Sequence, residues 1–352
     1  MNELLTMLIL FAPLILVMVL ANLAEAQRQR EEAYQGWAVT SYLVVGAFYG
    51  LLMLGGLLIN GFALLVQQQP QLLEELTAST GGPNPLLQAD SLPLLGVGLW
   101  APALVGILVL LPPVRRLLAR LLPLDAGSPV HAVALSLSAL IVIQLLFTLG
   151  IGLNNLAESL AAQEATGGTS TTLSGLWAQQ VLTAVFAFFG VGFLIRRDWS
   201  ATLQRLGLVV PSLGNIGVGI VVGLGMVPLV MVIEQVSSQF NIGIDPSVQK
   251  LTEQLLGPLF NSPLGIITLG VAAALGEETI FRGAVQPRFG IVLTALLFAL
   301  VHSNYGISLS TLIVFLFGLL LGIVRKRTNT STTMISHALY NMSLGILASL
   351  GF

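Results

Sequence analysis

The stretch from Pro263 to Phe281 reads PLGIITLGVAAALGEETIF. It is almost entirely apolar and long enough to cross a bilayer as a helix, which takes about 20 residues. Two adjacent carboxylates, Glu277 and Glu278, nevertheless lie within it. A charged side chain at membrane depth is costly, so such residues usually mark a functional site and have a partner. The stretch therefore predicts a membrane-spanning helix that carries a functional site.

The composition of the whole chain places it in the same class. Of 352 residues, 55% are hydrophobic and 9% are charged, whereas soluble domains carry roughly 25% charged residues. This composition predicts an all-α polytopic membrane protein whose surroundings are the lipid bilayer. The absence of cysteine excludes disulfides and thiolate metal sites, and the net charge of -2 gives no sign of nucleic-acid binding.

Apolar windows of spanning length predict about ten transmembrane helices. We place them at residues 4–24, 38–66, 93–113, 132–153, 174–195, 214–235, 263–285, 290–304, 308–324 and 331–350. The polar connections Gln67 to Ser91 and Asn154 to Thr172 contain neither lysine nor arginine.

Basic residues instead follow alternate predicted helices, as the positive-inside rule requires. They are Arg28, Arg30, Arg115, Arg116, Arg120, Arg196, Arg197, Arg205, Arg325, Lys326 and Arg327. Only Lys250 falls on the other side. This pattern predicts that both termini lie outside. Arginine supplies nearly all of the basic residues, which suggests a GC-rich bacterial genome and hence a bacterial cell membrane.

Helical spacing assigns different roles to the two glutamates. Glu278 and Arg282 are four residues apart, with the acid before the base, which is the favourable order for an ion pair on one helix face. Successive residues of an α-helix point about 100° apart, so Glu277 faces elsewhere. We expect Glu278 and Arg282 to be structural, and Glu277 to act as a general base or proton shuttle.

Two of the three histidines can be placed at the depth of Glu277 by counting. A tight hairpin about Phe289 and Gly290 puts Glu277 and His302 level, each twelve residues from the turn. At about 1.5 Å per residue this depth is about 18 Å. His337 and Asn341 share a face of the last predicted helix at a similar depth. The motif-bearing helices are therefore expected to form a bundle around an intramembrane polar site.

The residues alone leave three functions open. Acidic and histidine side chains at membrane depth suit hydrolysis by an activated water. They also suit a proton- or ion-coupled transporter, or a scaffold held together by polar contacts.

Three short motifs resemble those of one family of membrane proteins. In chain order they are EETIFR at Glu277–Arg282, FALVH at Phe298–His302 and HALYN at His337–Asn341. They are similar to the EExxxR, FxxxH and HxxxN motifs of the CAAX protease and bacteriocin-processing (CPBP, or ABI) family of intramembrane endopeptidases. The resemblance divides the chain into a catalytic helical core at 261–352 and a transmembrane region of unknown role at 1–260.

The resemblance implies a role for each matching residue. Glu277 and His302 would activate a water for attack on a peptide carbonyl, and His337 and Asn341 would stabilise the oxyanion. Glu278, Arg282 and Phe298 would support them structurally. The substrate would be a peptide or a membrane protein, as in bacteriocin processing. A catalytically inactive member of the same fold is the alternative.

The need for a metal is a separate question. Family members are often labelled metalloproteases, and Glu277, His302 and His337 would be the three ligands of a catalytic zinc. The sequence has no HExxH motif, and asparagine is a poor zinc ligand. We therefore expect no cofactor, with zinc as the alternative.

Overall fold

The computed structural model describes residues 2–79, 88–165, 173–240, 242 and 245–351. Within these residues the regular elements are helices, so the prediction of an all-α membrane protein is confirmed. Parts of the two polar connections without basic residues, 80–87 and 166–172, lie outside the described residues.

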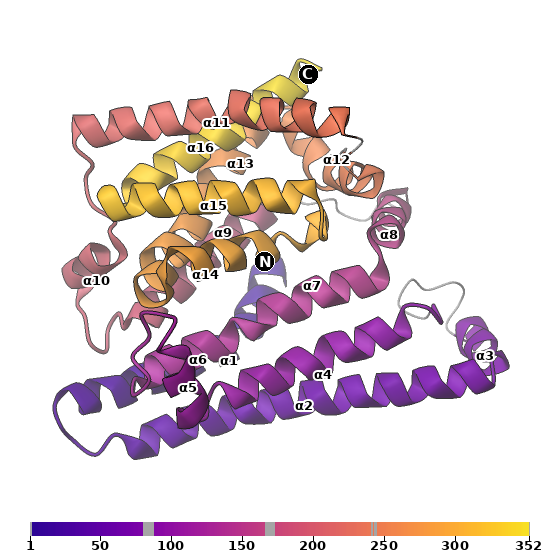
Figure 1. Cartoon of the computed structure of the whole chain (residues 1–352), viewed down its shortest axis with the longest axis horizontal. Coiled ribbons are helices and arrows are strands. Elements are labelled where there is room, and N and C mark those ends of the chain that lie inside the picture. Colours follow the sequence, from indigo (N-terminus) through magenta and orange to yellow (C-terminus); the bar gives the residue numbers. More distant parts are fainter. Residues whose placement is uncertain (1, 80–87, 166–172, 241, 243–244, 352) are drawn as a thin grey trace.

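The first eight helices include a long hairpin along one edge of the molecule (Figure 1). They are α1 (Asn2–Gln29), α2 (Gln35–Gln68), α3 (Gln71–Ser79), α4 (Leu92–Leu108), α5 (Pro112–Leu118), α6 (Pro129–Leu137), α7 (Ala139–Ile151) and α8 (Leu153–Ala165). Helices α2 and α4 pack side by side, and α4 in turn packs on α7. The chain bends by 90° between α4 and α5, where Pro112 and Pro113 begin the new helix.

The remaining helices form a bundle that contains the predicted motifs. They are α9 (Leu173–Val191), α10 (Trp199–Leu206), α11 (Leu213–Gln239), α12 (Pro246–Phe260), α13 (Pro263–Ala273), η2 (Ala274–Val285), α14 (Gln286–Val301), η3 (Ser303–Tyr305), α15 (Leu309–Arg327) and α16 (Thr330–Ser349). The central element is η2, which packs against α9, α14 and α16.

Each of the ten predicted segments coincides with one or two of these helices. By length and composition, the described residues contain seven helices able to cross a membrane, or up to eight if the bent pair α4 and α5 is one span. This count takes Pro263–Val301 as a single stretch and omits α16, which is rich in serine and threonine. Ten spans therefore stay a prediction.

The Pro263–Val301 stretch reverses at Gly290. This glycine has φ 78° and ψ 177°, a conformation that residues with a Cβ rarely adopt. Glu277 and His302, which counting placed level about this turn, have side-chain atoms 3.7 Å apart. The predicted hairpin is confirmed.

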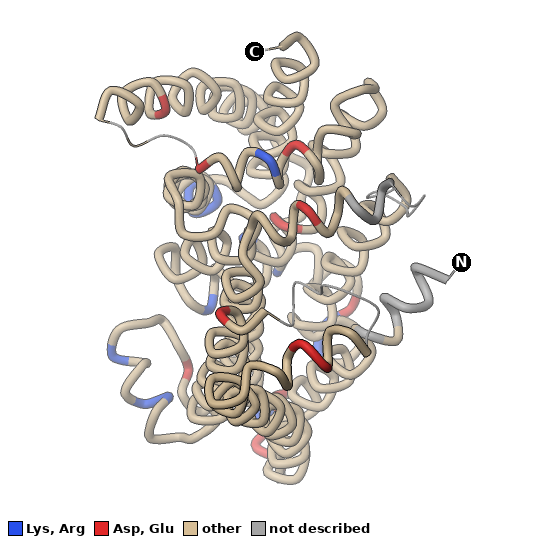
Figure 2. Tube along the Cα trace, turned by 90° about the vertical axis from the view of Figure 1, so that its right-hand side faces the viewer, with Lys and Arg blue, Asp and Glu red and all other residues tan. Residues whose placement is uncertain are grey.

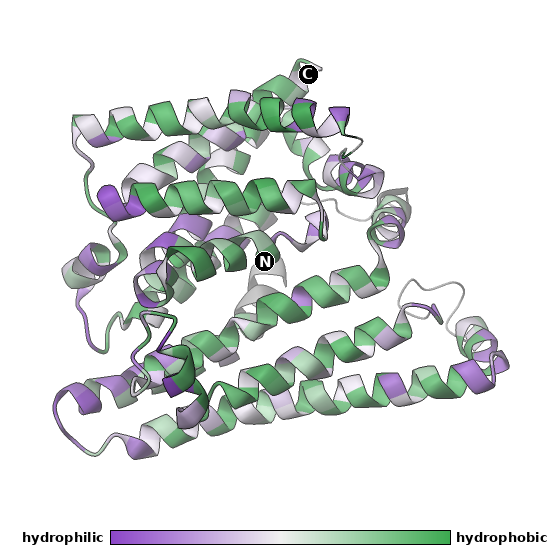
Figure 3. Cartoon of the chain, viewed as in Figure 1, coloured by the Kyte–Doolittle hydropathy of each residue, from purple (hydrophilic) through white to green (hydrophobic). Residues whose placement is uncertain are grey.

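Polar residues gather at the two ends of the long helices (Figure 3). Helices α3, α8 and α12 lie at one end, and α5 and α10 lie at the other (Figure 1). Seen from the first end, most charged residues on the three short helices are acidic (Figure 2). Arg115 and Arg116 lie on α5, and Arg205 lies on α10. Acidic and basic segments are therefore separated along the helix direction.

Local sequence signals fix the start of the helices that carry the site. Ser262 caps α13 by accepting a hydrogen bond from the Gly265 amide at 3.0 Å, and Pro263 occupies the first turn. Asn329 caps α16 in the same way, accepting from the Thr332 amide at 2.8 Å. Such caps satisfy amides that have no partner within the helix, and they favour a helix start at these residues.

Candidate active site

The two glutamates lie on a π-helix rather than on the α-helix assumed from the sequence. Element η2 runs from Ala274 to Val285. A π-helix closes its hydrogen bonds between residues five apart, is rare, and occurs frequently at functional sites. The wider turns change the directions derived from α-helical geometry, although residues four apart still meet.

Glu278 and Arg282 form the ion pair expected from their spacing. The Arg282 Nε lies 3.3 Å from the Glu278 Oε2, and both side chains are 0% exposed. The Arg282 guanidinium also lies over the Phe298 ring, 4.7 Å from its centroid. A buried charge without a partner is strongly destabilising, so each member of this pair requires the other.

Glu278 has a second contact that the sequence did not predict. Its Oε1 lies 3.0 Å from Nδ1 of His337. A histidine whose Nδ1 is engaged by a carboxylate presents its Nε2 to the other side. Glu278 therefore joins Arg282 on η2 to His337 on α16, and it orients that imidazole as well as balancing the arginine.

Both imidazoles face the second carboxylate. The Glu277 Oε2 lies 3.7 Å from the His302 Nε2 and 4.0 Å from the His337 Nε2. The three side chains come from η2, from the end of α14 and from α16. The structure thus brings together the three residues that the sequence proposed as the centre of the site.

His302 is held in one orientation by its surroundings. Its Nδ1 lies 2.8 Å from the Phe298 carbonyl oxygen, and Tyr305 stacks on its ring with centroids 5.8 Å apart. The next residue, Ser303, accepts hydrogen bonds from Gln144 and Thr148 of α7. With Nδ1 directed at a carbonyl, Nε2 is the free ring nitrogen and it points at Glu277.

Asn341 is the predicted site residue with the weakest link to this group. Its Nδ2 donates to the Leu269 carbonyl of α13 at 3.5 Å, which is long for a hydrogen bond. It lies one turn after His337 on α16. The structure therefore places Asn341 beside the site, with its carboxamide turned towards α13.

Phe298 packs at the centre of the group, as its position in the second motif suggested. Its ring is 1% exposed. It makes edge-to-face contacts with Phe281, His302 and His337 at centroid separations of 5.3, 5.1 and 5.9 Å. This one apolar ring contacts both imidazoles and the arginine.

Sequence reasoning missed two residues that touch the site, Tyr305 and Gln180. Tyr305 stacks on His302, and Gln180 of α9 donates a hydrogen bond from Nε2 to the Glu277 Oε1 at 3.4 Å. The signal for Gln180 was the glutamine pair in the middle of the apolar run LWAQQVLTAV. It lies about a hundred residues before the motifs, so spacing along the chain could not connect them.

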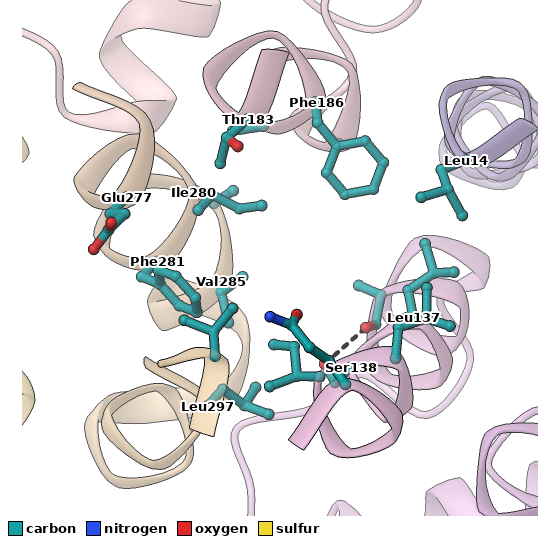
Figure 4. Close-up of a pocket in the computed structure, with 18 of the residues that line it drawn as sticks. Leu14, Leu137, Ser138, Thr183, Phe186, Glu277, Ile280, Phe281, Val285 and Leu297 are labelled. Carbon is teal, nitrogen blue, oxygen red and sulfur yellow. Dashed lines mark hydrogen bonds between the residues drawn. The ribbon is translucent and has the colours of Figure 1, made fainter. Parts of the chain in front are cut away.

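A cavity of about 350 Å³ adjoins the site. It is bounded by α1, α6, α7, α9, η2 and α14, with Glu277 and His302 at its margin. Figure 4 shows Glu277 on one side and Leu14 of α1 on the opposite side, with Phe186 and Ile280 between them. The cavity walls are mostly apolar, and much of their surface comes from helices upstream of residue 261.

The facing atoms of Glu277, His302 and His337 are further apart than the ligand atoms of an ideal tetrahedral zinc site. Zinc binds nitrogen and oxygen at about 2.0–2.2 Å, so neighbouring ligand atoms lie about 3.4 Å apart. The separations from the Glu277 Oε2 are 3.7 and 4.0 Å. Among the described residues, no group of three histidine, aspartate or glutamate side chains has the arrangement of a metal site.

Comparisons with known proteins agree with the motifs. Residues 259–343 match the family model of the type II CAAX prenyl endopeptidase Rce1-like proteins. An uncharacterized 24.3 kDa protein of Escherichia coli is 30% identical over 165 residues, which cover 44% of this chain and 73% of that protein. No solved structure matches the chain.

The match covers the segment in which η2, α14 and α16 converge. It also contains the three motifs in their order. The chain belongs to the CAAX protease and bacteriocin-processing family of membrane proteins.

Proposed function

We propose that this protein is an intramembrane endopeptidase that hydrolyses a peptide bond with a water activated by Glu277 and His302. The observation that carries the proposal is the meeting of one carboxylate oxygen with two imidazole Nε2 atoms, at 3.7 and 4.0 Å. These separations exceed a direct hydrogen bond. They suit groups that contact the same small molecule between them.

Glu277 and His302 would act together as the general base. A carboxylate or an imidazole within hydrogen-bond reach of a water can take its proton as the oxygen attacks the carbonyl carbon. The proton then passes to the departing amine as the C–N bond breaks. His302 is suited to this role because its Nδ1 faces the Phe298 carbonyl at 2.8 Å, which leaves Nε2 as the acceptor.

His337 and Asn341 would stabilise the negative oxygen of the tetrahedral intermediate. Preorganised donors directed at developing charge lower the barrier most in a site that excludes water. His337 is 3% exposed and is oriented by Glu278 through Nδ1, so it would donate from Nε2 when protonated. Asn341 would have to turn from the Leu269 carbonyl, and the 3.5 Å contact there is weak enough to exchange.

The surroundings of the site support our proposal for the substrate class. The apolar cavity beside Glu277 would receive apolar side chains of a peptide or of an unwound membrane-protein segment. We propose that the protein acts in a bacterial cell membrane with both termini outside.

The function is tested with the purified full-length protein in proteoliposomes and a library of internally quenched fluorescent peptides. Wild-type protein should cleave members of the library, and Glu277→Gln should not, because an amide cannot accept the proton. Both proteins should unfold at similar denaturant concentrations. Full cleavage by Glu277→Gln, or none by the wild type, would overturn the proposal.

We further propose that hydrolysis needs no bound metal. Elemental analysis of active protein should find zinc well below one atom per chain, and chelators should leave the cleavage rate unchanged. Stoichiometric zinc, removed together with activity by a chelator and restored by adding zinc, would contradict this part while leaving the peptidase proposal intact.

A further inference from the structure

We infer that Gln180 is a positioning residue that fixes the Glu277 carboxylate for catalysis, an inference that rests on the proposed endopeptidase function. Gln180 lies on α9, outside the segment 259–343 that matches the family model. Its side chain is 7% exposed. The helix that carries it belongs to the region of the chain for which the sequence suggested no role.

The two oxygens of Glu277 face different helices. Oε1 accepts the hydrogen bond from the Gln180 Nε2 at 3.4 Å, whereas Oε2 faces His302 and His337. The last torsion of a glutamate side chain has broad minima, so a carboxylate without such a donor turns easily. A donor on Oε1 therefore determines that Oε2 is the oxygen presented to the imidazoles.

The length of the contact between Gln180 and Glu277 is compatible with this positioning role. The distance of 3.4 Å is long, but catalytic hydrogen bonds are often long before the substrate binds and shorten in the complex.

Packing at Gly276 holds the amide in place. A Cβ on Gly276 would lie 2.7 Å from the Gln180 carbonyl oxygen and closer still to the side-chain Oε1, so η2 and α9 approach each other only because this residue is glycine. The Gln180 Oε1 is buried and has no hydrogen-bond partner among the described residues. Turning the amide over would face this oxygen towards the carboxylate, which repels it.

An unpaired buried carbonyl oxygen is costly, and each such group in a folded protein calls for an explanation. A leucine or methionine at position 180 would fill the same space without that cost. We infer that the amide serves the donation to Glu277, the one hydrogen bond that its side chain makes to the described part of the chain.

The test compares Gln180→Met, which keeps the length of the side chain and removes the donor, with Gln235→Met as a matched control. Gln235 is exposed on α11. With the peptide that the wild type cleaves fastest, Gln180→Met should lower kcat about tenfold, the effect of losing a hydrogen bond to a charged group. The KM should stay within about twofold, because the substrate contacts are retained.

A second measurement does not need a substrate. Dicyclohexylcarbodiimide reacts with carboxyl groups in apolar sites, and mass spectrometry reports its addition to Glu277. Gln180→Met should be labelled at Glu277 several-fold faster than the wild type, because a carboxyl group that Gln180 no longer holds can turn towards the reagent. Gln235→Met should be labelled at the wild-type rate.

The two measurements separate the possible failures. If the wild type cleaves no peptide, the proposed function is wrong, and labelling alone decides the role of Gln180. Equal labelling rates in Gln180→Met and the wild type would overturn the inference whatever the activity. A Gln180→Met protein with wild-type kcat would overturn it as well, and so would a loss expressed wholly in KM.

Discussion

Replacing Glu278 by alanine should destabilise the protein far more than removing any surface charge. The substitution leaves Arg282 as a guanidinium that is 0% exposed and has lost its ion-pair partner at 3.3 Å. It also removes the carboxylate from Nδ1 of His337. Breaking a buried ion pair by deleting one partner costs about 3–5 kcal/mol, so the free energy of unfolding should fall by about that amount.

The assay is equilibrium unfolding of the full-length protein by SDS in mixed micelles, followed by circular dichroism. The matched control is Glu158→Ala, which breaks an ion pair with Lys250. The Lys250 Nζ lies 3.7 Å from the Glu158 Oε1, and the side chains of Glu158 and Lys250 are 69% and 47% exposed. Exposed pairs contribute about 0–1 kcal/mol. The two glutamate substitutions should therefore differ by at least about 2 kcal/mol.

A double variant separates the charge from the volume. Replacing the pair by Glu278→Leu and Arg282→Met removes both charges, so its stability should exceed that of Glu278→Ala, because buried pairs are often replaced by apolar residues at little cost. The reasoning would be refuted if Glu278→Ala lowered the free energy of unfolding by no more than Glu158→Ala does. A double variant less stable than Glu278→Ala would show that the buried charge is not the cause.

Three further predictions concern other parts of the structure. His337→Ala and Asn341→Ala should each lower kcat by about a hundredfold with a smaller change in KM, as for loss of an oxyanion donor; wild-type kcat in either would remove that residue from the mechanism. Gly276→Ala should lower the free energy of unfolding by about 1–3 kcal/mol, because the added Cβ overpacks against α9. The control is Gly46→Ala, whose Cβ would meet nothing within 4 Å. It should change the free energy of unfolding by less than about 0.5 kcal/mol. The chain has no cysteine, so Arg116→Cys, Lys326→Cys and Gln68→Cys can be labelled singly with an impermeant maleimide in whole cells. Gln68→Cys should react from outside and the other two should not, and labelling of Gln68→Cys and Lys326→Cys from the same side would contradict the topology.

Much of the site was within reach of the sequence because its central relations are local. The pairing of Glu278 with Arg282 follows from a spacing of four residues, and the structure places them 3.3 Å apart. Glu277 and His302 meet because the chain reverses at Gly290, and residues at equal distances along the chain from this turn lie at the same depth. Apolar runs determined the membrane class, since a bilayer admits an exposed backbone only as helices or closed barrels.

The lateral arrangement of the helices was decided by the tertiary structure alone. His337 contacts Glu278 rather than only facing Glu277, and Asn341 turns to α13. Helix α9 supplies Gln180. The cavity is enclosed by α1, α7 and α9 together with η2, so its walls come from both sides of residue 261. The division of the chain at that residue stays a prediction. The physical reason is that helices in a membrane are held by close packing of small residues and by hydrogen bonds between helices. A Cβ on Gly276 would lie 2.7 Å from the Gln180 carbonyl oxygen. These two residues are nearly a hundred positions apart, so no periodic pattern in the sequence predicts that they meet.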